Sequence, residues 1–245
     1  MTVFQILVIA VAFIVAGTAK GAIGIGLPPI AIGIMTLALP LGDALAILTF
    51  PTLLTNVFQA FYGGRFLVLL RRFGPMSALA VAGVLGAGMT LGKLGSPGML
   101  GWLGALLVFY ASLALFAWRP VMPRAHEPWA SPLIGLASGV VAGVTGMAAV
   151  PFLPYMQSLE MDRHELVQAL GIMFLFIIGM LAVVLAWQGA YHITNLASSV
   201  AAIAPTMAGV WLGQHARRRL SPETFRKAFI FGMFAVGLHM ATALL

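Results

Sequence analysis

The chain has 245 residues, of which 61% are hydrophobic and 8% charged, whereas soluble domains carry about 25% charged residues. This composition excludes an ordinary soluble protein and predicts an all-α polytopic membrane protein, because a bilayer tolerates only structures that satisfy their own backbone. The net charge of +7 does not indicate nucleic-acid binding, since the basic residues occupy short gaps between apolar runs, and the absence of cysteine excludes thiol chemistry.

Eight apolar runs approach the roughly 20 residues that a helix needs to cross a bilayer. In chain order they are Phe4–Ala19, Ala44–Phe61, Met76–Leu91, Met99–Trp118, Pro132–Val144, Leu166–Trp187, Leu196–Leu212 and Phe225–Leu244. Two shorter apolar segments, Leu27–Leu39 and Val150–Leu159, follow the first and fifth runs. The longest polar interval lies mid-chain, so we expect a first transmembrane repeat over residues 1–118, a linker over 119–131 and a second repeat over 132–245.

The two halves match each other at an offset of about 122 residues. The matched pairs are Gly17 with Gly139, Gly21 with Gly143, Gly24 with Gly146, Pro29 with Pro151, Asp43 with Glu165 and, at an offset of 121, Gly88 with Gly209. Internal duplication of this kind is the usual plan of secondary transporters.

Basic residues alternate between equivalent loops of the two halves. Arg65, Arg71 and Arg72 follow the second run, whereas the equivalent gap at 188–195 has no Lys or Arg. The next gap holds only Lys93, whereas its equivalent at 217–227 holds five basic residues. Under the positive-inside rule, this exchange predicts inverted repeats of about five membrane segments each, with both termini outside the cytoplasm. Eight plain helices in parallel repeats are the alternative.

Each half contains one stretch in which glycine and proline predict a broken helix, namely Gly17–Pro29 and Gly139–Pro151. A helix breaks inside a membrane only where protein or water satisfies the freed backbone groups. The restarting helix presents N–H groups and its positive dipole end, which suits an anion. We therefore expect the two breaks to meet near the membrane midplane, and the alternative for each single glycine is close helix packing.

Polar residues inside the apolar runs are candidates for substrate contact. Lys20 interrupts an apolar run beside a break, where an ionisable group is a functional candidate, and snorkelling to the headgroups is the alternative. Asn56 and Gln59 share one helix face and can donate to an oxyanion, with interhelical hydrogen bonds as the alternative. The predicted substrate site consists of Lys20, Gly21, Gly24, Gly26, Pro28, Pro29, Asn56, Gln59, Gly143, Thr145, Gly146, Pro151 and Gln168. No catalytic residue, metal ligand or cofactor is predicted.

The Gly17–Pro29 stretch, the segment Pro51-Thr-Leu-Leu-Thr-Asn56 and the Gly139–Pro151 stretch resemble the TauE/SafE sulfite exporter family. The second half departs from the first, since Ala142 stands opposite Lys20. The resemblance implies a permease of the bacterial inner membrane, a secondary transporter of a small sulfur-containing anion such as sulfite, thiosulfate or an organosulfonate (sulfoacetate). A homodimer and coupling to protons are further hypotheses, and no nucleic-acid partner is expected.

Two other functions are alternatives to transport. An intramembrane serine protease-like enzyme could use Ser138 and His239, but Leu136 stands where a Gly-x-Ser-Gly motif requires glycine. A passive anion channel needs a continuous polar lining, and the apolar runs contain few polar residues. Transport by alternating access is therefore the leading interpretation.

Overall fold

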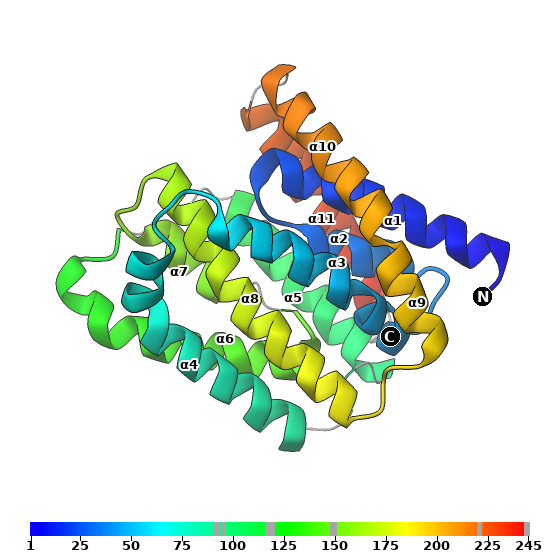
Figure 1. Ribbon diagram of the computed structural model, residues 1–245, viewed down its shortest axis with the longest axis horizontal. Helices are drawn as coiled ribbons and strands as arrows, with labels where there is room; N and C mark the ends of the chain where they lie inside the picture. The colour runs from blue at the N-terminus through cyan, green and yellow to red at the C-terminus, as the bar shows by residue number, and fades with distance from the viewer. Residues whose placement is uncertain (91–93, 95–96, 116–120, 148–150, 220–221, 243–245) are drawn as a thin grey trace. The chain divides into compact units, whose positions relative to one another are not determined.

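The computed structural model describes residues 1–90, 94, 97–115, 121–147, 151–219 and 222–242, and within these residues it contains helices and no strand (Figure 1). In chain order the helices are α1 (Val3–Ile23), α2 (Leu27–Met35), α3 (Leu41–Phe61), α4 (Phe66–Thr90), α5 (Pro97–Leu115), the 3₁₀ turn η1 (Arg124–His126), α6 (Glu127–Thr145), α7 (Phe152–Ser158), α8 (Arg163–Trp187), α9 (Ile193–Ala201), α10 (Ile203–Arg219) and α11 (Pro222–Ala241). The predicted all-helical class is confirmed. Lys93 and Val150, which entered the predictions above, lie outside the described residues.

Several helices are long and apolar enough to cross a membrane. Among the described residues, six segments meet this condition: Val3–Ile23, Leu41–Phe61, Phe66–Thr90, Arg124–Thr145, His164–Trp187 and Ile193–Ala216. The described parts of α5 and α11 contain shorter apolar stretches, Met99–Phe109 and Ile230–Ala241. The nine residues of α2 span only about 14 Å at 1.5 Å each, so α2 is too short to cross by itself.

Among the described helices, α4 and α6 begin five or more residues before their predicted apolar runs. The predicted run begins at Met76, but α4 begins at Phe66, and α6 begins at Glu127 rather than Pro132. The two extensions are linked by Arg72, whose Nε and Nη2 donate to the Glu127 carboxylate at 2.6 and 2.8 Å. This bidentate pair joins the two extended stretches and compensates the charges of Arg72 and Glu127 within them.

The chain forms two compact units, and each draws segments from both halves of the sequence. Unit 1 comprises Met1–Thr52, Gly95–Ala117 and Ala190–Leu245, whereas unit 2 comprises Leu53–Leu94 and Trp118–Gly189. Helix α3 therefore contributes its first residues to unit 1 and its last residues to unit 2.

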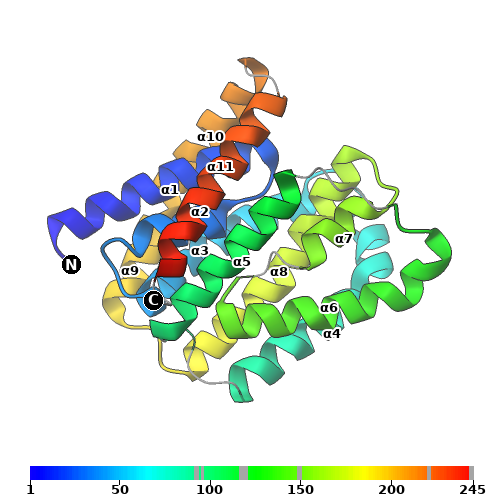
Figure 2. The same ribbon diagram turned by 180° about the vertical axis from the view of Figure 1, so that it is seen from behind.

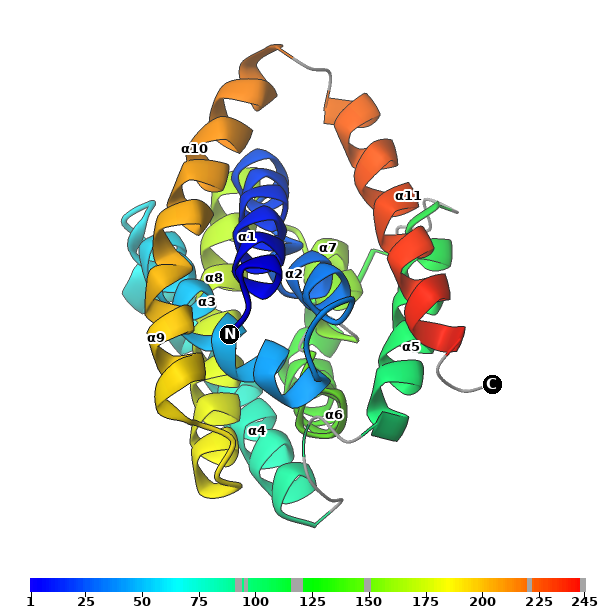
Figure 3. The ribbon, with the colours of Figure 1, turned by 90° about the vertical axis from the view of Figure 1, so that its right-hand side faces the viewer.

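In unit 1, α1 and α10 run parallel in close contact (Figures 1 and 3). Gly209 packs against Ile14 and Thr18, and one turn further along Gly213 packs against Thr18 and Ala22. Small residues let two helix backbones approach each other closely, which is the main source of packing between helices in lipid. In the same unit α5 packs beside α11 (Figure 2).

In unit 2, α4 packs in parallel with both α6 and α8. Gly135 and Gly139 of α6 pack against Met76 and Ala80 of α4, four residues apart on each helix. The Ser77 hydroxyl of α4 lies 3.2 Å from the Met173 sulfur of α8. All three helices therefore begin at the same end of unit 2.

Ion pairs gather at this end of unit 2. Arg65 pairs with Glu165 beside the start of α8, and Arg72 pairs with Glu127 at the start of α6. Arg124, in the turn before α6, lies 3.0 Å from the Glu160 carboxylate.

Candidate substrate site

The first predicted break is present in unit 1. The interruption between the two helices covers Gly24–Gly26 and is shorter than the predicted stretch Gly17–Pro29. Helix α1 ends at Ile23 and is followed by Gly24, which has φ 92° and donates its N–H to the Lys20 carbonyl at 2.7 Å. Gly26, with φ 100°, precedes α2, and Pro28 and Pro29 lie in the first turn of α2. These angles suit glycine, and proline suits the first turn because no helical partner is lost there.

The second predicted break is present in unit 2 and uses a side chain that the first break lacks. Helix α6 ends at Thr145 and is followed by Gly146, which has φ 73° and donates to the Ala142 carbonyl at 2.7 Å. The Thr145 hydroxyl accepts the Met147 N–H at 3.2 Å and so stabilises the turn. Pro151 immediately precedes α7.

Gly21 and Gly143 lie within helices rather than at the breaks. A side chain at Gly21 would collide with the Val210 backbone of α10. A methyl group at Gly143 would lie 2.7 Å from the Val84 carbonyl oxygen of α4. Close packing, the alternative weighed for single glycines, therefore accounts for both positions in the fold, and their contact with substrate stays a prediction.

Lys20 lies in the last turn of α1, one turn before Gly24. Its exposed fraction is only 8%, and Leu27, Pro28 and Pro29 at the start of α2 are also buried. The first break therefore combines a buried cationic residue with the start of a short helix.

Helix α3 carries a buried polar stripe along its length. Asn56 is fully buried, and Thr49, Thr52 and Thr55 are buried on the turns before it. Thr49 is absent from the predicted site, although its position seven residues before Asn56 places it near the same helix face. The spacing of Thr49, Thr52 and Asn56, three and four residues apart, was the feature of the sequence that could have indicated Thr49.

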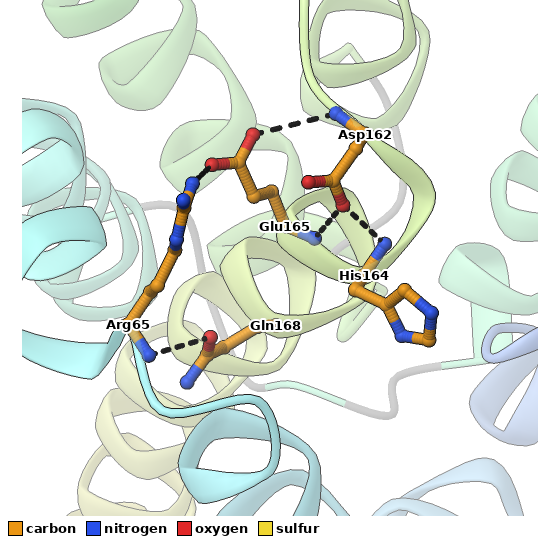
Figure 4. Close-up of polar contacts among 5 residues, drawn as sticks. All are labelled: Arg65, Asp162, His164, Glu165 and Gln168. Atoms are coloured by element: carbon orange, nitrogen blue, oxygen red, sulfur yellow. Dashed lines mark hydrogen bonds and ion pairs between the residues drawn. The ribbon is translucent and has the colours of Figure 1, made fainter.

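Gln59 and Gln168 make interhelical hydrogen bonds in unit 2. The Gln59 amide donates to the Val167 carbonyl at 2.8 Å, and the Gln168 amide donates to the Ala60 carbonyl at 2.8 Å. Gln168 also accepts the Arg65 backbone N–H at 3.3 Å (Figure 4). Both side chains thus hold the end of α3 against α8, which is the alternative weighed for the amides, and their contact with substrate stays a prediction.

The start of α8 is capped beside this junction. The Asp162 carboxylate accepts the backbone N–H groups of His164 and Glu165 at 2.8 and 2.9 Å (Figure 4). The Glu165 carboxylate in turn accepts the Asp162 N–H at 3.3 Å and also pairs with Arg65. Glu165 therefore acts as the first-turn acid of a capping box, as its position predicts.

Each unit holds its own part of the predicted site. Unit 1 contains Lys20, Gly21, Gly24, Gly26, Pro28 and Pro29. Unit 2 contains Asn56, Gln59, Gly143, Thr145, Gly146, Pro151 and Gln168. In the described part of the chain, no three His, Asp or Glu side chains are grouped so that they could hold a metal ion.

Tyr191 is a further polar residue that contacts α3, and it is absent from the site predicted from the sequence. The Tyr191 hydroxyl donates to the Thr49 hydroxyl of α3 at 3.0 Å. Burial raises the pKa of Tyr191 above its ordinary value, and the hydrogen bond with Thr49 opposes this effect. At neutral pH the phenol therefore stays protonated and can donate.

Comparison with known protein families identifies the family of this chain. A family model described as sulfite exporter TauE/SafE matches residues 9–240. The chain belongs to this family. No curated protein and no solved structure matched it. The TauE/SafE resemblance drawn from the residues is thereby confirmed, and the protein is a multi-pass membrane transporter of the anion exporter type.

Proposed function

We propose that this TauE/SafE protein is a secondary transporter that moves a small sulfur-containing anion, such as sulfite, thiosulfate or sulfoacetate, across the bacterial inner membrane by alternating access. The family match over residues 9–240 supports an exporter-type transporter. The observation that carries the anion-binding role is the buried Lys20 beside the Gly24–Gly26 break. A buried ammonium favours a negatively charged solute, and the start of α2 adds its positive dipole end but few N–H donors, because Pro28 and Pro29 have no N–H.

Burial of Lys20 supports this role over snorkelling. A snorkelling lysine extends its ammonium to the headgroups and leaves it exposed, whereas Lys20 is covered by the protein. Lysine is a compact charge whose ammonium offers three donors, which suits the oxygens of sulfite or a sulfonate. The equivalent position in the second half is Ala142, so the proposed site is asymmetric.

The polar stripe of α3 supports a second contact to substrate through Asn56. The side chain is fully buried in a helix that is otherwise apolar enough to span a membrane. Hydroxyl and amide donors bind oxyanion oxygens without adding charge. We propose that Asn56 donates to the substrate.

The fold supports the inverted arrangement that alternating access uses. Within unit 2, the end of α3 meets the start of α8, its equivalent in the duplication, through Gln59 and Gln168. These two equivalent helices thus reach the same end of the unit from opposite directions. Arg65, Arg72 and Arg124 also gather at that end, which we propose to be cytoplasmic. Both chain termini are then proposed to lie outside the cytoplasm.

Uptake of radiolabelled sulfite, thiosulfate and sulfoacetate into proteoliposomes tests the function. We expect saturable flux of one of these anions, and a dependence on an imposed pH gradient would support proton coupling. Flux that does not saturate would favour a channel, and a folded protein that moves none of the three anions would refute the proposal.

The mass of the protein in detergent tests the proposed homodimer.

Two substitutions test the site in the same assay. Lys20→Ala and Asn56→Ala should each weaken transport, and Lys20→Ala by about tenfold to a hundredfold, because it removes a charge-assisted hydrogen bond. Two control variants accompany these substitutions. Lys20→Arg retains the charge at residue 20. Arg71→Ala removes a charge from an exposed position, and it should therefore transport normally. Unchanged kinetics in both Lys20→Ala and Asn56→Ala would remove this site.

A further inference from the structure

Pro51 frees a backbone carbonyl in the middle of α3. In an α-helix the carbonyl of residue 47 accepts the N–H of residue 51, but proline has no N–H to donate. Helix α3 is one of the segments able to span a membrane, where an unsatisfied carbonyl carries a large penalty. The Ile47 carbonyl therefore needs a donor from outside the helix.

Ser199 of α9 supplies that donor. Its hydroxyl is fully buried and donates to the Ile47 carbonyl at 2.7 Å. The same oxygen accepts the Phe50 N–H at 3.2 Å. A single side chain, 152 residues away from Ile47 in sequence, thus serves both a backbone acceptor and a backbone donor in the turn that Pro51 opens.

The duplication provides an internal comparison for this contact. An offset of 122 residues pairs Ser199 with Ser77 and Pro51 with Met173. The Ser77 hydroxyl lies 3.2 Å from the sulfur of Met173, the residue that takes the place of Pro51 in the second half. The Ser77 hydroxyl donates to the Phe73 carbonyl of its own helix at 2.9 Å, and Met173 retains its N–H. The two serines therefore occupy equivalent positions in the duplication, but of the two Ser199 alone satisfies a carbonyl that proline has freed.

The position of Pro51 gives this contact a consequence for the site. A helix bends most easily where a proline removes an internal hydrogen bond. The segment that follows carries Asn56, so the geometry at Pro51 sets the direction in which Asn56 is presented.

We propose that Ser199 is a positioning residue of the transporter, which fixes α3 at Pro51 and thereby orients the segment that carries Asn56. This inference rests on the proposed function, because Asn56 is its proposed substrate contact. Ser199 itself does not need to touch the substrate.

A double-mutant cycle tests the proposal. Ser199→Ala should lower the maximal transport rate about tenfold, because the Ile47 carbonyl loses its donor. Pro51→Ala restores an N–H for that carbonyl, so adding Ser199→Ala to Pro51→Ala should change the rate less than twofold. Ser77→Ala is the matched control and should also change the rate less than twofold. An equal loss on Ser199→Ala in both backgrounds, or an equal loss on Ser77→Ala, would overturn the proposal.

A second measurement separates this inference from the proposed function. The wild-type protein, the single variants Ser199→Ala and Pro51→Ala, and the double variant are compared by their thermal unfolding midpoints in detergent, which do not depend on transport. Ser199→Ala should lower the midpoint only when residue 51 is proline. Wild-type protein that moves no anion would refute the proposed function, whereas additive midpoint shifts at residues 51 and 199 would refute the contact itself.

Discussion

The parallel contact between α4 and α6 predicts opposite effects for the same substitution at two glycines of α4. A methyl group at Gly83 would lie 2.5 Å from the Leu136 carbonyl oxygen and 2.8 Å from the Val140 nitrogen. Both atoms belong to the α6 backbone, which cannot turn aside as a side chain could. Overpacking of this kind costs about 1–3 kcal/mol, so Gly83→Ala should destabilise the protein by that amount.

Gly86, one turn further along α4, provides the control. Apart from the adjoining turns of α4 itself, no atom of the described residues lies within 4 Å of a methyl group added there. Alanine is favoured over glycine in a helix by up to about 1 kcal/mol, so Gly86→Ala should be neutral or stabilising. The two variants should therefore differ by about 1–4 kcal/mol, with the wild-type protein between them or level with Gly86→Ala.

Unfolding of the purified protein by a denaturing detergent, followed by circular dichroism, measures both free energies. The substitutions are chemically identical and lie on one helix, so differences in propensity and composition cancel between them. Equal stability of the two variants would refute the reasoning, because it would mean that α6 does not approach α4 closely at Gly83.

Three further predictions concern the breaks and the polar contacts. Gly26→Ala should lower stability by about 1–2 kcal/mol because alanine is strained at φ 100°, whereas Gly179→Ala, in open space on α8, should not lower the thermal midpoint. Arg72→Ala removes two hydrogen bonds to a carboxylate and should cost about 1–3 kcal/mol, whereas a similar loss in the exposed Arg71→Ala would contradict a specific ion pair. Gln168→Ala leaves the last turn of α3 without its buried donor and should cost about 1–3 kcal/mol, and an unchanged midpoint with weakened transport would instead favour substrate contact alone.

The sequence by itself determined the class of the protein and the location of its breaks. A chain with 8% charged residues must satisfy its backbone within lipid, which leaves helices as the simplest solution. Gly24 and Gly146 end helices because glycine readily takes positive φ, and Pro28 and Pro151 lie where the next helices begin. These are local rules, so they can be applied without knowing what any residue contacts.

Only the tertiary structure decided how the same residue types are used. Glycine serves equally to end a helix and to admit a neighbouring backbone, and it was the contact of Gly21 with Val210 that placed Gly21 in a packed helix. An amide can bind substrate or a backbone carbonyl, and the bond from Gln168 to Ala60 joins residues 108 apart in sequence. The proline of α3 was visible in the sequence, but the serine that satisfies its freed carbonyl lies in another helix. Such partners depend on which helices pack together, and apolar runs that all look alike to lipid carry little information about that choice.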